Sequence, residues 1–175
     1  MTQTVSLSEV SLMEVLANKE ARVKRQQEWL KSHSLPLISF SVNMPGPVKM
    51  SEAAMHIFNQ GVDAVIEACG SHGWTIVTRQ LLQQKTGPEG VFVVDAPSAS
   101  LLKLAMMQVE NGHQLGRLMD LDVLGTDGKI ISRQGSRMAR RQCLLCEEDA
   151  VVCARSRRHD LQALLGKINE MTSYG

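Results

Sequence analysis

Aromatic side chains make up only 3% of the 175 residues, and the formal net charge is +1. Few aromatic rings leave few platforms on which the bases of a single-stranded nucleic acid could stack. A net charge this small also provides no overall attraction to a polyanion. Both deficits argue against nucleic acid as the partner of this protein.

The chain also lacks an apolar run long enough to cross a bilayer. Its first residues, MTQTVSLSEV, lack the basic and apolar regions of a secretory signal. We therefore expect a cytoplasmic protein with no membrane partner, whose 4 cysteines form no disulfides. Because repeats and low-complexity tracts are absent, we expect a single domain over residues 1–175 that includes the Cys-, His- and Arg-rich segment 133–159.

Short-range signals predict alternating helices and strands. Ser11 and Glu14 form a capping-box pattern, which begins a helix that extends to about His33. The other expected helices run from Ser51 to Gly70, from Ser98 to about Asn111, and from Asp160 to about Met171. Strands are expected at residues 37–42, 73–83, 91–94 and 117–124, with hairpin connections at 85–90 and 126–128 and a returning segment at 129–132. So many hairpins favour an α+β fold with a mostly antiparallel mixed sheet flanked by helices.

The strand expected at 117–124 carries two aspartates. Because side chains alternate along a strand, Asp120 and Asp122 should point to the same face, roughly 7 Å apart. Two carboxylates so placed suit Mg²⁺, which prefers carboxylate oxygens together with substrate phosphates. Arg117 is expected on the same strand. The alternative is a solvated strand face without a metal, although aspartate is disfavoured in strands.

Three cysteines and a histidine form a second candidate metal site. Cys143, Cys146, Cys153 and His159 have a spacing compatible with tetrahedral Zn²⁺. Only one Cys-x-x-Cys pair is present, and free cysteines are commonly buried. Structural zinc and simple core packing therefore both remain open.

The segment around these cysteines is rich in arginine and contains no lysine. The arginines of residues 133–158 are Arg133, Arg137, Arg140, Arg141, Arg155, Arg157 and Arg158. Guanidinium groups are planar and always charged, which suits phosphate oxygens. The alternative is a solvated basic surface, which would normally mix lysine with arginine.

Several stretches together resemble the apo-citrate lyase phosphoribosyl-dephospho-CoA transferase family. They are residues 115–123 (LGRLMDLDV), 131–133 (ISR), 141–146 (RQCLLC), 153–159 (CARSRRH), 38–40 (ISF), 43–49 (NMPGPVK) and 86–89 (TGPE), with Glu20, Arg22 and Gln26 in the first helix. The resemblance covers essentially the full chain. It implies a nucleotidyltransferase-like enzyme that moves 2'-(5''-triphosphoribosyl)-3'-dephospho-CoA onto a serine of the citrate lyase acyl carrier (gamma) subunit and releases pyrophosphate.

The resemblance suggests a role for each candidate residue. Asp120 and Asp122 would hold Mg²⁺, and Arg117 would bind a phosphate or the departing pyrophosphate. Precursor binding is expected from Asn43, Gly46, Lys49, Arg133, Arg155, Arg157 and Arg158. A third carboxylate is common in nucleotidyltransferases, and Glu110 and Asp95 are candidates. The enzyme that makes the precursor is a further candidate partner.

Two hypotheses of other classes remain beside the transferase. A zinc-supported nucleic-acid-binding module would explain the arginines but would leave Asp120 and Asp122 without a role. A non-catalytic adaptor for the carrier subunit would survive the loss of both aspartates.

Overall fold

The first helix begins at the capping box that the sequence predicts. The computed structural model describes residues 9–132 and 141–173, and in it α1 spans Leu12–His33. The Ser11 hydroxyl accepts a hydrogen bond from the Glu14 amide, and the Glu14 carboxylate accepts one from the Ser11 amide. These bonds satisfy amides that a helix start leaves unpaired, so the boundary is set locally.

Within the described residues, four strands form one antiparallel sheet in the order β2-β3-β1-β4. They are β1 (Leu37–Val42), β2 (Thr75–Gln84), β3 (Gly87–Asp95) and β4 (Met119–Leu124). The predicted α+β class with an antiparallel sheet is confirmed. The predicted connection at 85–90 is too long, however, because Gly87 and Pro88 already pair with Gln84 and Gln83. Only Lys85 and Thr86 make the turn.

The chain around β4 also differs from the prediction. Arg117 does not lie on the strand but in a single 3-10 turn, η1 (Gly116–Leu118), which leads from α3 (Ala99–Gly112) into β4. After β4 the returning segment makes one isolated bridge, between Leu124 and Ile130. The Ile131 amide also donates to the Val123 carbonyl at 2.9 Å, and further along this edge of β4 side chains of α3 bond to Leu121, as described below.

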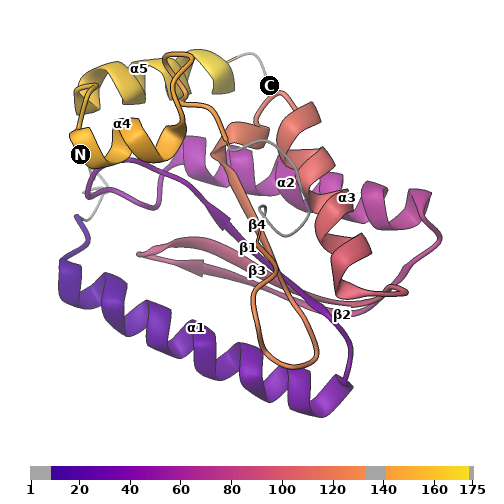
Figure 1. Cartoon of the computed structure of the whole chain (residues 1–175). Helices are drawn as coiled ribbons and strands as arrows, with labels where there is room; N and C mark the ends of the chain where they lie inside the picture. The colour runs from indigo at the N-terminus through magenta and orange to yellow at the C-terminus, as the bar shows by residue number, and fades with distance from the viewer. Residues whose placement is uncertain (1–8, 133–140, 174–175) are drawn as a thin grey trace, which may run out of the picture.

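Helices cover both faces of the sheet, with α2 (Glu52–Ser71) and α3 on one side and α1 on the other (Figure 1). Residues of alternate strand positions, such as Ile38 and Phe40, face α2 and α3 and form the main core. The rings of Phe40 and Phe58 stack with centroids 5.1 Å apart. Gly61 makes this close approach feasible, since a Cβ there would lie 2.2 Å from the Phe40 ring.

The sheet face beneath α1 is apolar at one end and polar at the other. Leu30 near the end of α1 packs on a small cluster with Leu37, Val93 and Leu124. Further along the same face the strands present Ser39, Ser41, Glu89, Asp120 and Asp122. Gln26 is the polar bridge between the two ends, because its Nε2 donates to Ser39 Oγ at 2.8 Å. The first half of α1 therefore lies over polar groups rather than over a core.

Two helices near the carboxyl end pack beside the α2 side of the molecule (Figure 1). The short helix α4 (Ala150–Ser156) is not predicted from the sequence, whereas α5 (Leu161–Thr172) begins at Asp160 as expected. The Asp160 carboxylate accepts a hydrogen bond from the Ala163 amide at 2.7 Å. In the part of the chain that the structure describes, each helix is too short or too polar to span a bilayer.

Candidate active site

The two aspartates of β4 point to the same face of the sheet. Asp120 pairs with Ser41 and Asp122 with Ser39, and the residue between them, Leu121, is buried on the opposite face. Both carboxylates therefore lie under α1, as strand alternation predicts. The Asp120 side chain is 42% exposed, so a ligand can reach it.

The pKa of Asp122 is higher than that of an ordinary aspartate. Although part of its side chain is exposed, the protein around it limits hydration, and this desolvation raises the pKa above the ordinary 3.8. Lys103 opposes the shift, while the neighbouring Asp120 and Glu110 carboxylates add to it. A concentration of negative charge with a raised carboxyl pKa is typical of a site that receives a cation or a proton.

The backbone between the two aspartates is held by α3. The Leu121 amide donates to Glu110 Oε2 at 2.9 Å, and the Lys103 ammonium donates to the Leu121 carbonyl at 3.1 Å. Both side chains are buried, with 4% exposure each. These bonds occupy the free edge of β4, so Glu110 braces the strand from outside rather than facing the pocket under α1.

Arg141 reaches the same strand from the carboxyl-terminal part of the chain. Its Nη1 donates to Asp120 Oδ1 at 2.7 Å and lies 3.9 Å from Glu110 Oε2. Its Nη2 donates to the carbonyls of Gly116 and Arg117 at 2.9 and 2.6 Å. The guanidinium thus links an aspartate, a buried glutamate and the turn before β4.

A pocket of about 140 Å³ opens beside Asp120. It is bounded by α1, the loop after β1, the β2–β3 turn and the start of β4. Its lining residues are Val15, Asn18, Lys19, Arg22, Ser41, Val42, Asn43, Met44, Lys49, Thr86, Gly87, Pro88, Glu89 and Asp120. Three cationic side chains therefore lie around the same space as two carboxylates, an arrangement suited to a phosphate group.

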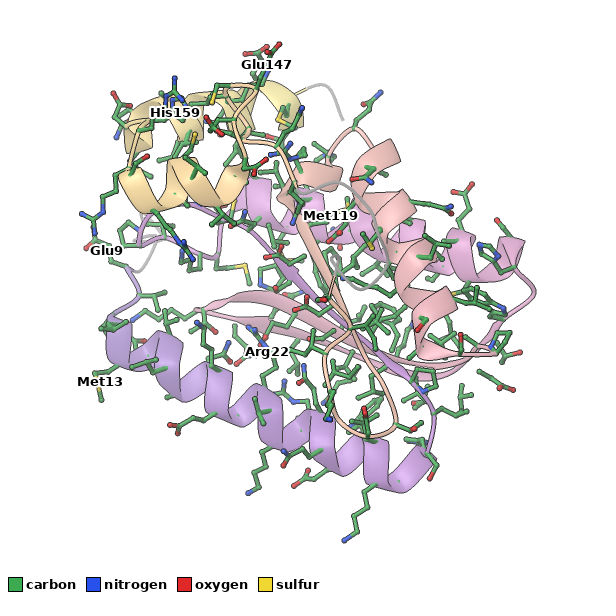
Figure 2. The ribbon with its side chains drawn as sticks, in the orientation of Figure 1. Glu9, Met13, Arg22, Met119, Glu147 and His159 are labelled. Carbon is green, nitrogen blue, oxygen red and sulfur yellow. The ribbon has the colours of Figure 1, made fainter. Side chains whose placement is uncertain are left out.

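Arg22 and Glu89 are pocket residues for which the sequence indicated no role. Figure 2 shows Arg22 extending from α1 toward the sheet. Its Nε is ion-paired with Glu89 Oε1, and Gln84 Nε2 donates to Glu89 Oε2 at 2.9 Å. Glu89 is buried at 5% exposure. The only sequence signal was that both residues belong to stretches shared with the resembled family.

The loop after β1 contributes Asn43 and Lys49 to the pocket. The Lys49 ammonium donates to the Met44 carbonyl at 2.7 Å, and burial lowers its pKa from the ordinary value. Gly46 faces elsewhere: its φ is +81°, and a Cβ would lie 2.8 Å from Leu161 of α5. It shapes the loop and its contact with α5 instead of lining the pocket.

The remaining predicted residues are not gathered here. Arg155, Arg157 and Arg158 are exposed at the end of α4 and do not line the pocket. Asp95, a candidate third carboxylate, is the last residue of β3 and pairs with Thr75, at the opposite end of the strand from Glu89. Arg133 lies outside the described residues.

The sequence-predicted cysteine and histidine ligands do come together. The ligand atoms of Cys143, Cys146, Cys153 and His159 all lie within 4.8 Å of one another. Cys146 Sγ is 3.5 Å from Cys153 Sγ and 3.4 Å from His159 Nε2. Figure 2 shows His159 at the α4–α5 end of the molecule. One nitrogen and three sulfur donors at this spacing fit a tetrahedral soft-metal site.

Backbone amides support this cluster. The Leu145 amide donates to Cys143 Sγ at 3.4 Å. Burial by itself would raise the Cys143 pKa, but hydrogen bonds from the amides of Leu145 and Cys146 and with the thiols of Cys153 and Cys146 together outweigh it, and the pKa is lowered. Burial, together with the neighbouring sulfurs, raises the pKa of Cys153 to about 11. A lowered thiol pKa favours the thiolate, which is the form that binds metal.

Comparison with known proteins places the similarity over almost the whole chain. Residues 10–174 match the family described as apo-citrate lyase phosphoribosyl-dephospho-CoA transferase. A protein of Vibrio cholerae serotype O1 (strain M66-2) named probable apo-citrate lyase phosphoribosyl-dephospho-CoA transferase is 60% identical over 163 residues, covering 93% of this chain and 92% of that protein. Proteins with that name without "probable", from Shigella boydii serotype 18 and Escherichia coli O157:H7 (strain EC4115 / EHEC), are 44% identical over 162 residues, covering 93% of this chain and 88% of each relative.

Proposed function

Because the chain belongs to the apo-citrate lyase phosphoribosyl-dephospho-CoA transferase family, we propose that the pocket beneath α1 holds the triphosphate of the prosthetic-group precursor during transfer. The protein is an enzyme that attaches this group to the acyl carrier (gamma) subunit of citrate lyase. The observation that carries the proposal is the meeting of Asp120 with Arg22, Lys19 and Lys49 around one pocket. A nucleic-acid-binding module or an adaptor would need no such arrangement.

Asp120 and Asp122 would hold Mg²⁺. The fit rests on two carboxylates on one strand face, with Asp120 in the pocket and Asp122 two residues further on. When bound, the cation would neutralise charge on the triphosphate and favour departure of pyrophosphate. Glu89 is a third carboxylate on the same face of the sheet. It lies across β1 from Asp120, because both residues pair with Ser41.

The nucleophile is the serine hydroxyl of the carrier subunit. Its oxygen forms a bond to the innermost phosphorus of the 5''-triphosphate, and the bond from that phosphorus to the bridging oxygen of pyrophosphate breaks. The serine proton passes to a carboxylate of the β4 pair, Asp120 or Asp122, as the nearby base. The products are a phosphodiester on the carrier and free pyrophosphate.

Cationic and polar groups of the pocket bind the phosphates. Arg22, positioned by Glu89, offers the guanidinium nitrogens that the ion pair leaves available, and Lys49 offers ammonium hydrogens. Asn43 and Thr86 add an amide and a hydroxyl to the pocket lining. The remaining predicted arginines would contact more distant parts of the precursor or the carrier. They are Arg117, Arg133, Arg155, Arg157 and Arg158.

The cysteine and histidine cluster would hold a structural Zn²⁺. Four protein donors complete a tetrahedral shell and leave no open position for catalysis. The metal would fix the segment that connects Arg141 to α4 and α5. A cytoplasmic location and contact with the precursor-making enzyme remain predictions.

Intact-mass spectrometry tests the proposed function directly. The purified protein, Mg²⁺ and triphosphoribosyl-dephospho-CoA are mixed with the apo carrier subunit, and the carrier should gain the mass of the prosthetic group on a serine. Asp120→Asn and Asp122→Asn should lower the rate at least about 100-fold, while Asp63→Asn, an exposed carboxylate of α2, should retain it. Full activity of Asp120→Asn or Asp122→Asn at saturating Mg²⁺ would disprove the cation assignment.

A further inference from the structure

The side chain of Arg141 is fixed by several partners at once. It bonds Asp120 Oδ1 and the carbonyls of Gly116 and Arg117, and it faces the buried Glu110 carboxylate. Only 19% of the side chain is exposed. A guanidinium with this many planar contacts has little freedom to move away from Asp120.

The backbone of Arg141 belongs to a different part of the molecule. Its carbonyl accepts a hydrogen bond from the Ala150 amide at 2.8 Å, at the start of α4. The next residue, Gln142, bridges to Asp149, and the Cys143 amide donates to the Glu148 carbonyl at 2.7 Å. These bonds close the loop that carries Cys143 and Cys146. Arg141 therefore joins the loop of the cysteine and histidine cluster to Asp120 of β4.

We propose that Arg141 is a positioning residue through which closure of the cysteine and histidine cluster orients Asp120 for cation binding. The inference rests on the proposed function, because it assumes that Asp120 and Asp122 bind a divalent cation. The inference extends the proposed function, because the cluster would influence cation binding at Asp120 as well as stabilise its own segment.

The contacts of Arg141 indicate that it should strengthen cation binding at Asp120. Arg141 engages only Oδ1 of Asp120 and leaves the second oxygen available as a ligand. Holding one oxygen removes the rotation that a free carboxylate would lose on binding a cation. Arg141 also offsets repulsion between Asp120 and Glu110. Removing such a support from a ligating group typically costs 10- to 100-fold in metal affinity.

Lysine is the informative replacement at this position. It keeps the positive charge, but a single ammonium cannot reproduce the planar fork that bonds Asp120 and two carbonyls together. Arg141→Lys therefore separates orientation from charge. Lys167→Gln is a suitable control because it removes a charge from α5, where Lys167 is ion-paired with Glu170 of the same helix at 3.9 Å.

The experiment measures Mn²⁺ binding to the full chain by electron paramagnetic resonance of the free ion. Zinc content is measured by atomic emission and folding by circular dichroism. Arg141→Lys should bind Mn²⁺ about 10- to 100-fold more weakly while retaining zinc and helix content. Cys146→Ser should lose zinc and show a similar loss of Mn²⁺ affinity. Lys167→Gln should match the wild type.

The double variant tests whether the two changes act through one link. If the cluster works through Arg141, Arg141→Lys with Cys146→Ser should bind Mn²⁺ no more weakly than the weaker single variant. Independent effects would multiply, and that outcome would overturn the proposal. If Cys146→Ser does not fold, His159→Gln replaces it, because it removes one ligand and leaves all three cysteines.

The remaining outcomes separate this inference from the proposed function. Wild-type Mn²⁺ affinity in Arg141→Lys, or in a folded variant that has lost zinc, would overturn the coupling alone. Absence of Mn²⁺ binding to the wild-type protein would overturn the cation site of the proposed function and the coupling with it.

Discussion

Arg22 of α1 is ion-paired with the buried carboxylate of Glu89 on β3, 67 residues later in the chain. The pair lies at the edge of the pocket that also contains Asp120. Gln84 holds the second oxygen of Glu89, so the carboxylate is fully engaged and the arginine is held in one place. Arg22 is thereby presented to the pocket without having to be ordered by the substrate.

Replacing Glu89 with glutamine should therefore weaken both folding and substrate binding. The free energy of unfolding should fall by about 1.5–3 kcal/mol, as expected for a buried hydrogen bond to a charged group. The KM for the precursor should rise more than kcat falls, because Arg22 contacts the phosphates in both ground and transition states. Urea unfolding and steady-state transfer assays measure the two effects. Glu28→Gln, at an exposed position on α1, is the control, and equal behaviour of the two variants would contradict the prediction.

The aspartates of β4 should differ in their effect on stability. Desolvation by the surrounding protein raises the pKa of Asp122, so the folded protein holds this proton more tightly than the unfolded chain does. The carboxyl then favours folding below its ordinary pKa of 3.8, and this contribution is lost as pH rises through the folded-state pKa. At pH 7 Asp122→Asn should be at least as stable as the wild type, with the difference shrinking toward acid pH.

Asp120→Asn is the matched comparison. It removes the ion pair with Arg141, so its unfolding free energy should fall by up to about 1 kcal/mol at pH 7. Urea unfolding of both variants between acid and neutral pH measures the contrast. Greater destabilisation by Asp122→Asn than by Asp120→Asn at pH 7 would refute the charge arrangement described for β4.

The four cysteines should fall into two classes in alkylation experiments. Cys69 is 1% exposed, and burial raises its pKa to about 11, so it should not react in the folded protein. The three cluster cysteines should be protected while zinc is bound. A chelator that removes the zinc should also unfold this segment, which ends the burial that raises the pKa of Cys153, so all three should then react. Mass spectrometry after iodoacetamide treatment should show no additions before chelation and three afterwards. Rapid labelling at Cys143, Cys146 and Cys153 in freshly purified, zinc-containing protein would contradict the cluster.

Gly46 and Gly166 should respond oppositely to alanine. Gly46 has a φ of +81° and a Leu161 methyl 2.8 Å from the position of a Cβ, so Gly46→Ala should cost about 1–3 kcal/mol. Gly166 lies within α5 with open space around it, so Gly166→Ala should stabilise by about 0.5–1 kcal/mol. Thermal unfolding distinguishes these signs. A stabilising Gly46→Ala would show that the loop does not need this backbone conformation.

Local interactions allowed much of the fold to be predicted from the sequence alone. The capping box at Ser11 and Glu14 and the N-cap at Asp160 involve atoms three residues apart, so they need no tertiary structure. The shared face of Asp120 and Asp122 follows from strand alternation. The cysteine and histidine cluster was predictable as a group because its first two members lie close in sequence and its donor types are distinctive.

Tertiary structure decided what surrounds these groups. Glu89 meets Arg22 only because β3 pairs beside β1 beneath α1, and no local pattern encodes that register. Asp95 lies at the opposite end of β3 from Glu89, where it pairs with Thr75. Within the described residues, the returning segment expected at 129–132 forms one bridge with β4, while Lys103 and Glu110 of α3 bond to the backbone of Leu121, a contact that no local pattern indicates. The sequence by itself therefore determined which side chains share a strand face or a turn, whereas partners distant in sequence depended on the packing of the sheet and helices.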